Sequence, residues 1–285
     1  MPQPHDDATI RDLDAKSRLI RRDIMQILLS QGGGHGGGDM SVADLVTALY
    51  FHQMRIDPRN PDWEQRDRLV LSKAHCSVAL YASLGELGFF DKEKWFSEYG
   101  ANDTILQGHA DQWACPGVDY SGGSLGMGLG FAAGLALADL LLSPRDRYGD
   151  YLPSHRVYCI TGDGESHEGS VWEAAMFAAQ WKLRNLINIV DYNQYCIGGS
   201  ITRTVELEPL AAKWRSFGWH VVEIDGHNMR EICDTLDYVD LLPGRPKCII
   251  AHTVKGKGVP EWEESHIHAG RVTQDLYDRT MTSFR

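Results

Sequence analysis

The chain has 285 residues, of which 43% are hydrophobic and 24% are charged. These ordinary globular proportions exclude a largely disordered chain, a collagen and a coiled-coil rod. The net charge of −11 disfavours nucleic-acid binding, because an acidic surface repels phosphate backbones.

The first half of the chain is dominated by helical patterns. Apolar spacing predicts a helix over 9–30, which the run 32–38 (GGGHGGG) should end. Ser41 should open the next helix, with Asp44 as a partial capping signal. Four further elements are expected here: a strand over 68–72, a helix over 77–87, a long ordered loop over 97–123 and an apolar helix over 125–142.

From residue 156 the pattern alternates between strands and helices. The expected strands are 156–161, 186–191, 219–224 and 247–252, and the expected helices are 169–181, 206–217 and 228–239. This alternation predicts an α/β fold with a doubly wound, mostly parallel sheet and helices on both faces. We expect a single domain over 1–285, with a core of about 10–270 and a C-terminal arm over 271–285.

The spacing of the cysteines and the lengths of the apolar runs indicate the cellular compartment in which the protein is expected. None of the six cysteines forms a C-x-x-C pair, which predicts buried, reduced thiols in a cytoplasmic protein. The N-terminus lacks the apolar stretch of a signal peptide. We expect no membrane span either, because the uncharged stretch 120–138 holds six glycines.

Two polar groups follow successive strands of the predicted sheet. Gly162-Asp163-Gly164 comes directly after one strand, and Asn193 stands thirty positions beyond Asp163. One strand–helix–strand unit has about this length, so both residues should reach the sheet edge where α/β folds bind ligands. A carboxylate, an amide oxygen and a backbone carbonyl suit Mg²⁺ or Ca²⁺. The alternative interpretation is that these are ordinary turn residues.

The segment 162–193 resembles the thiamine diphosphate-binding signature, a Gly-Asp-Gly followed by an Asn about thirty residues later. Three further segments are similar to transketolase motifs: 67–75 (DRLVLSKAH), 106–109 (LQGH) and 123–126 (GSLG). The resemblance covers about 10–270 and implies the thiamine diphosphate-binding fold, specifically its pyrophosphate-binding domain. The chain departs from the family pattern at Ala74, where Gly is common, and at Met127, where Gln is common.

The resemblance also implies roles for individual residues. The implied metal ligands are Asp163, Asn193 and the backbone carbonyl of Tyr195. The implied cofactor contacts are His75, Gly123, Ser124, Leu125, Asp163, Gly164, Asn193, Ile197 and His268. The implied catalytic residues are His35, His109, His268 and Glu168, and Glu168 and Glu173 match acidic residues at the subunit interface. Histidines suit this chemistry because they exchange protons near neutral pH.

A transketolase is longer than this chain, and the chain is similar only to the first part of a transketolase. The resemblance therefore implies a separate C-terminal transketolase subunit that carries the pyrimidine-binding domain, most simply in an α2β2 heterotetramer. The expected activity, present only with that partner, is transfer of a two-carbon ketol unit from a ketose (phosphate) donor to an aldehyde or aldose. Thiamine diphosphate and Mg²⁺ (or Ca²⁺) are the expected cofactors.

Several alternatives remain open from the sequence. The chain could be the α subunit of another thiamine diphosphate enzyme, a 2-oxo acid dehydrogenase or a carboligase, or a non-catalytic cofactor-binding subunit. His75 and His109 favour a transketolase, because each stands in its motif. The run 255–258 (KGKG) is expected to bind phosphate or to form a solvated basic turn. Three aromatic residues are expected in the core or at a subunit interface: Trp172, Phe177 and Trp181.

Overall fold

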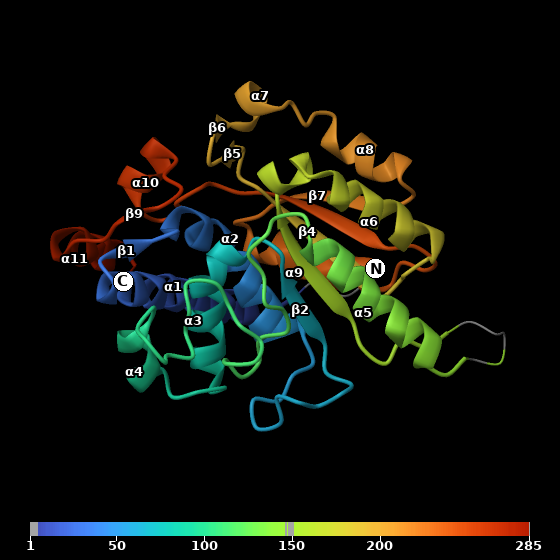
Figure 1. The fold of residues 1–285 in the computed structure, drawn as a ribbon, viewed down its shortest axis with the longest axis horizontal. Helices are drawn as coiled ribbons and strands as arrows, with labels where there is room; N and C mark the ends of the chain where they lie inside the picture. The colour runs from blue at the N-terminus through green and yellow to red at the C-terminus, as the bar shows by residue number, and fades with distance from the viewer. Residues whose placement is uncertain (1–4, 146, 148–150, 285) are drawn as a thin grey trace.

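The computed structural model describes residues 5–145, 147 and 151–284 (Figure 1). Within this part of the chain, five parallel strands form the central sheet in the order β2-β3-β4-β8-β7. The strands are β2 (Arg68–Leu71), β3 (Val157–Gly162), β4 (Leu186–Tyr192), β7 (His220–Asp225) and β8 (Lys247–His252). The predicted parallel sheet is thereby confirmed, with the strand expected over 68–72 at one edge.

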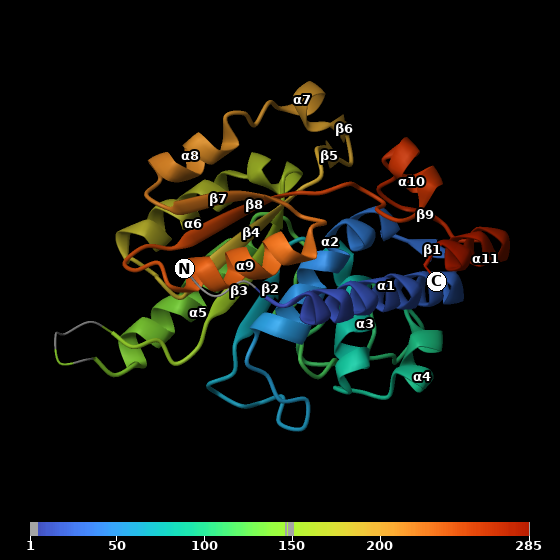
Figure 2. The ribbon, with the colours of Figure 1, turned by 180° about the vertical axis from the view of Figure 1, so that it is seen from behind.

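Helices cover both faces of this sheet, as a doubly wound fold requires (Figures 1 and 2). One core packs α1 (Asp7–Ser30), α2 (Gly36–Ala48), α3 (Ser77–Leu87) and α9 (Met229–Asp240) against one face. The other core packs α5 (Gly128–Leu142), α6 (Gly169–Gln180) and α8 (Leu210–Ser216) against the opposite face. Successive strand residues serve different cores: Cys159 lies in the second and Ile160 in the first.

Shorter elements connect these layers. They are the strand pairs β1 (Gly33–Gly34) with β9 (Gly270–Arg271) and β5 (Tyr195–Cys196) with β6 (Gly199–Ser200), and the helices α4 (Lys92–Trp95), α7 (Ile201–Thr204), α10 (Pro260–Ser265) and α11 (Gln274–Ser283). A π-helix, η1 (Leu49–Gln53), extends α2, and three 3₁₀ turns are η2 (Ala74–Cys76), η3 (Phe96–Glu98) and η4 (Gly164–His167). In the described residues, no helix has both the length and the apolar character needed to cross a membrane.

Helix α2 begins at Gly36, inside the glycine run, and not at Ser41 as predicted. Tertiary packing explains the difference. A Cβ atom on Gly37 would lie 1.7 Å from the carbonyl oxygen of Ile267, and one on Gly38 would lie 2.5 Å from the sulfur of Cys76. The glycines are therefore needed where the first turn of α2 touches two distant segments, a use that local helix propensity does not reveal.

The C-terminal segment folds back onto the domain. We expected an arm over 271–285, but this segment forms helix α11, which contacts α1 and buries Leu276 and Phe284. Strand β9 also pairs with β1, which follows α1, so the C-terminal end of the chain lies on the side of the molecule opposite the N-terminal end (Figure 1).

Asp39, in α2, should make the stability of the protein depend on pH. Its side chain is fully buried, Oδ1 accepts a hydrogen bond from the Ala79 N–H at 3.0 Å, and Oδ2 has no hydrogen-bond partner among the described residues. Burial raises the pKa of Asp39 from 3.8 to about 7. The folded chain therefore keeps this proton between pH 4 and 7, where the unfolded chain has lost it.

Because the folded state binds one more proton than the unfolded state in this range, the free energy of unfolding falls as pH rises from 4 to 7, by about 1.4 kcal/mol per pH unit. Above pH 7 both states have lost the proton, and Asp39 causes no further change. Asp39→Asn should remove that contribution. Urea unfolding at pH 5, 6, 7 and 8 would measure it as the difference between the two proteins. A constant difference across this range would show that Asp39 does not titrate as described.

Candidate active site

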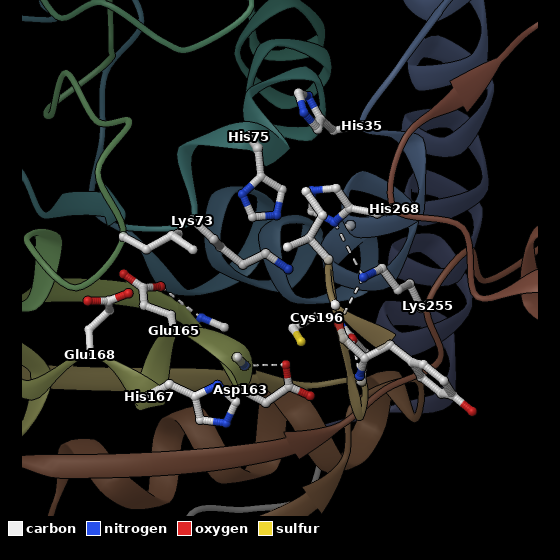
Figure 3. A pocket seen from close by; sticks show the side chains of 18 of the residues that line it. His35, Lys73, His75, Asp163, Glu165, His167, Glu168, Cys196, Lys255 and His268 are labelled. Atoms are coloured by element: carbon white, nitrogen blue, oxygen red, sulfur yellow. Dashed lines mark hydrogen bonds between the residues drawn. The ribbon is translucent and has the colours of Figure 1, made fainter. Parts of the chain in front are cut away.

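A cavity of about 490 Å³ opens at the carboxyl edge of the central sheet. Its wall combines the start of α2, the turn after β2, the loop before α5, the turns after β3 and β4, and the segment after β8 (Figure 3). The following predicted site residues line it: His35, His75, His109, Gly123, Leu125, Asp163, Gly164, Glu168, Asn193, Tyr195, Ile197 and His268. Ser124 and Glu173 are exposed and do not line the cavity.

Asp163 and Asn193 lie side by side, as their spacing predicts. Strands β3 and β4 are neighbours, and the Asp163 N–H donates to the carbonyl of Asp191 at 3.2 Å. The N–H of Gln194, the residue after Asn193, donates to the Asp163 carboxylate. The two turns therefore meet directly at the edge of the sheet.

Three oxygen donors of different kinds lie in these turns, on residues that all line the cavity. The Asn193 amide nitrogen donates to Asp191 Oδ2 at 2.9 Å, which fixes the amide plane, and its oxygen accepts from the Tyr195 N–H at 3.2 Å. The Tyr195 carbonyl accepts from Lys255 Nζ at 2.8 Å. Amide and carbonyl oxygens each have two lone pairs, so both retain capacity for a further ligand. Together with the Asp163 carboxylate they form the hard-oxygen set that Mg²⁺ and Ca²⁺ prefer.

The Asp163 carboxyl lies where the fold disfavours its ionised form. It is 2% exposed, and burial, together with the nearby charge of Asp191, raises its pKa to about 7. An ionised carboxylate in this position lacks sufficient positive charge nearby. A divalent cation would supply that charge and lower the pKa again.

A buried ion pair supports the turn after β4. Asp191 is fully buried and accepts hydrogen bonds from four groups: Lys73 Nζ, Ser41 Oγ, Asn193 Nδ2 and Thr253 Oγ1. Burial acts to raise the pKa of Asp191, but the charge of Lys73 outweighs it and keeps the pKa below its usual value. The sequence analysis did not identify this pair, because its partners lie 118 positions apart.

Four histidines from four distant segments form one cluster beside these oxygens. The ring centroid of His35 lies 5.6 Å from that of His75, 6.0 Å from that of His109 and 5.4 Å from that of His268. The His75 and His268 centroids are 5.0 Å apart. In Figure 3, the rings of His35, His75 and His268 lie together, with Asp163 across the cavity.

Burial and nearby positive charge favour the neutral form of three of these imidazoles, those of His35, His75 and His268. Burial and the charge of Lys73 lower the pKa of His75 to about 2, and burial and the charge of Lys255 lower the pKa of His268 to about 4. The pKa of His35 is also lowered, by burial and then by His109. A neutral imidazole has one donor and one acceptor, so it can both orient a hydroxyl group and exchange a proton with it.

Lys255 and Glu165 are site residues to which the sequence analysis gave no defined role. Lys255 is only 3% exposed and lies with Nζ 3.4 Å from His268 Nδ1, so the solvated-turn alternative is wrong for this residue. Glu165 is buried and accepts hydrogen bonds from Ser72 and from the N–H groups of Gly126, at 2.8 Å, and Gly162, at 2.9 Å. It thereby joins the loop before α5 to the turn after β3. In the sequence, the KGKG run was the feature that could have indicated Lys255, and the position directly after Gly-Asp-Gly could have indicated Glu165.

The cavity rim carries apolar and sulfur-containing side chains. Ile197, at the β5–β6 turn, is 83% exposed, and Leu125, in the loop before α5, also lines the cavity. Cys196 also lines the cavity and is half-buried, whereas we predicted buried cysteines; the other five are buried. An anionic, metal-bound group fits the floor of this cavity and an apolar ring fits its rim.

Comparisons with known proteins identify the family of the chain. A family model described as "Transketolase, thiamine diphosphate binding domain" matches residues 14–280. A 6-deoxy-6-sulfo-D-fructose transketolase subunit from Clostridium sp. (strain MSTE9) is 41% identical over 93% of this chain and 94% of that protein. An apulose-4-phosphate transketolase subunit from Phocaeicola vulgatus is 37% identical over 95% of this chain and 93% of that protein.

A solved transketolase structure is similar to this chain in its fold. The transketolase from Leishmania mexicana superposes with a TM-score of 0.88 and 27% identity over 96% of this chain. The chain spans 41% of that protein, whereas it matches the two bacterial subunits over nearly their whole length. The chain therefore belongs to the transketolase family and corresponds to its thiamine diphosphate binding domain.

Proposed function

We propose that the chain is the N-terminal subunit of a two-component transketolase, which transfers a two-carbon ketol unit from a ketose or ketose phosphate to an aldehyde. The observation that carries this proposal is a single cavity in which a hard-oxygen donor set faces four clustered histidines. Relatives of the same length are named as transketolase subunits, which supports an arrangement in two components.

The floor of the cavity suits a divalent cation and the diphosphate that it accompanies. Asp163, Asn193 and the Tyr195 carbonyl would hold Mg²⁺, and Ca²⁺ would fit the same donors. The Gly164 backbone and the Lys255 ammonium would face the diphosphate, and Leu125 and Ile197 would contact the apolar part of the cofactor. When bound, thiamine diphosphate supplies the carbon nucleophile that allows a ketose to be cleaved beside its carbonyl group.

The histidines would act on the sugar. His35 and His109 would hold donor hydroxyl groups by hydrogen bonds, and His268 would move a proton to or from a substrate oxygen. His75, the most deeply placed, would contact the cofactor together with the backbone of Gly123. Glu168 stands at the N-cap position of α6 on the cavity rim, where we assign it to coupling with the partner protein.

An exposed apolar face on α5 and α6 supports the need for a partner. Its members are Phe131 (39% exposed), Met176 (54%), Phe177 (40%) and Trp181 (45%), and Glu173 is exposed on the same helix. Such a patch favours an interface. We assign it to the C-terminal subunit with the pyrimidine-binding domain, in an α2β2 complex. The free thiols are in keeping with a cytoplasmic location, and two cores on one sheet support a single domain.

Phe177→Asp should weaken binding of the partner subunit by at least about tenfold, because it places a charge in the apolar face. Tyr238→Asp is the matched control: this tyrosine is 43% exposed on α9, which covers the opposite face of the sheet. Isothermal titration with the purified partner would measure both affinities. Equal affinities for the two variants would remove α6 from the proposed interface.

The function is tested by co-expressing the chain with the product of its neighbouring gene and assaying the purified complex with Mg²⁺ and thiamine diphosphate. Xylulose 5-phosphate would serve as a general donor with several aldehyde acceptors, and 6-deoxy-6-sulfo-D-fructose and apulose 4-phosphate would test the specialised substrates named for relatives. Two-carbon transfer is the expected result. A complex that binds the cofactor but turns over no ketose, or acts on 2-oxo acids with a lipoyl partner, would overturn the proposal.

A further inference from the structure

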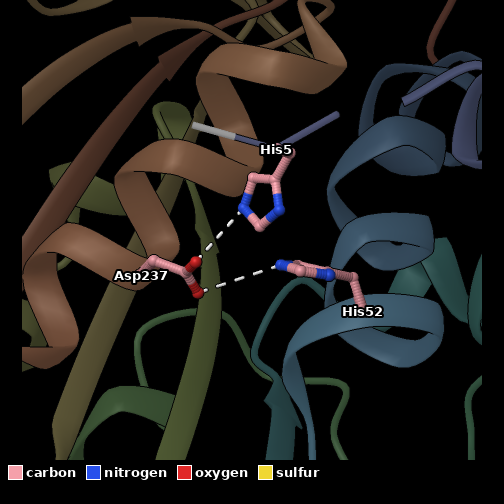
Figure 4. A group of neighbouring side chains, drawn as sticks. All are labelled: His5, His52 and Asp237. Atoms are coloured by element: carbon pink, nitrogen blue, oxygen red, sulfur yellow. Dashed lines mark ion pairs between the residues drawn. The ribbon is translucent and has the colours of Figure 1, made fainter. Parts of the chain in front are cut away.

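A second group of metal-binding side chains lies away from the cavity. His5 precedes α1, His52 belongs to η1 at the end of α2, and Asp237 belongs to α9 (Figure 4). One ligand atom from each lies within 4.8 Å of the others. The α2–η1 helix separates His52 from the cavity residue His35 by 17 positions, which corresponds to about 25 Å at the helical rise per residue.

The distances between these atoms match the edges of a metal coordination sphere. His5 Nε2 lies 3.1 Å from one oxygen of Asp237, and His52 Nε2 lies 3.8 Å from the other. Ligands at about 2.0–2.1 Å from a tetrahedral zinc ion are about 3.3 Å apart. Asp234, one turn earlier on α9, has Oδ1 3.8 Å from His5 Nε2 but lies outside the group of mutually close ligand atoms, so its side chain would have to move to become a fourth ligand.

The converging atoms need a positive charge between them. Both Nε2 atoms are buried, and neither makes a hydrogen bond among the described residues. The two rings stack edge to face with centroids 4.5 Å apart. A single metal ion would satisfy both nitrogens and the carboxylate together.

The backbone around His5 is already held in place. Arg230, on α9, donates a hydrogen bond to the carbonyl of His5 and pairs with Asp7 at 2.5 Å. Asp6 caps α1 by accepting from the Thr9 N–H at 2.7 Å. These contacts fix the direction in which the His5 side chain leaves the chain, so ligand binding would require little ordering.

We propose that His5, His52 and Asp237 form a structural zinc site that fastens the segment before α1 to η1 and α9. Imidazole nitrogens select zinc over Mg²⁺ and Ca²⁺, which take oxygen ligands, so this site is chemically distinct from the one at Asp163. With Asp234 as the fourth ligand the sphere would be closed, as structural zinc sites are. The proposal does not depend on the transketolase function.

The test is a titration of the EDTA-treated full chain with Zn²⁺ by calorimetry and with Co²⁺ by visible absorption, which reports tetrahedral nitrogen and oxygen ligation. His5→Gln and His52→Gln should each lower Zn²⁺ affinity at this site by at least about tenfold and remove the Co²⁺ spectrum. His252→Gln is the matched control, because His252 forms a surface pair with Glu223 at 3.3 Å without a second histidine. It should bind Zn²⁺ like the wild type.

Zinc binding at the cavity histidines would give the same signals, so these residues require their own variant. A His35→Gln/His109→Gln chain should keep the Co²⁺ spectrum and the high-affinity Zn²⁺ event. Zinc should also slow amide hydrogen exchange over residues 5–13 in the wild type but not in His5→Gln. The proposal is overturned if His5→Gln and His52→Gln bind Zn²⁺ like the wild type, or if only the cavity variant loses it.

Discussion

Asp163→Ala is expected to lower Mg²⁺-dependent affinity for thiamine diphosphate by at least about 100-fold. Loss of groups that merely orient metal ligands costs about 10–100-fold, and Asp163 would contribute the charged ligand itself. The remaining donors, Asn193 and the Tyr195 carbonyl, are neutral and offset less of the charge on a divalent cation. Calorimetric titration of cofactor with and without Mg²⁺ measures the effect.

The apo protein provides an internal check on this variant. Because burial raises the pKa of Asp163 to about 7, its ionised form is disfavoured in the fold, and removing the carboxyl should leave the unliganded chain as stable as the wild type or more so. Asp225→Ala is the matched control, since Asp225 is exposed at the end of β7 in the same sheet and does not line the cavity. Equal cofactor affinity in the two variants would refute the metal assignment.

Lys73→Met is expected to destabilise the fold by about 3–5 kcal/mol, because it leaves the fully buried carboxylate of Asp191 without its cation. The loss should extend to cofactor binding, since Asp191 orients the amide of Asn193. Urea unfolding of the cofactor-free chain measures the first effect and calorimetry measures the second.

Two further variants separate the ion pair from a simple loss of packing. The double variant Lys73→Met/Asp191→Asn removes both charges, and it should recover part of the stability lost in Lys73→Met. Arg279→Met removes an exposed cation that pairs with Asp275 on α11, and it should leave unfolding unchanged. Asp191→Asn alone completes the comparison: if its stability loss and that of Lys73→Met simply added in the double variant, the two charges would not be coupled.

The parts of the fold that could be predicted from sequence are those set by local pattern. Strands β3 and β4 are buried on both faces, so they are nearly continuous apolar runs that stand out between polar turns. Once those strands were placed, the spacing between Asp163 and Asn193 predicted that the two would meet. The histidines followed from motifs, because each stands in a segment that resembles the family.

What could not be predicted depends on contacts between distant segments. The start of α2 at Gly36 is decided by the carbonyl of Ile267, and the Lys73–Asp191 pair joins two strand ends that are far apart in sequence. The cluster of His5, His52 and Asp237 likewise requires α1, η1 and α9 to be packed first. The spacing of apolar residues and of motifs does not predict contacts between segments that are far apart in the sequence.

Anomalous diffraction from crystals of the chain with its partner, Ca²⁺ and thiamine diphosphate tests the central claim most directly. We predict one calcium peak about 2.3–2.6 Å from a carboxylate oxygen of Asp163, the amide oxygen of Asn193 and the carbonyl oxygen of Tyr195. Cofactor density without a peak among these three oxygens, or a peak bound to other residues, would contradict the account.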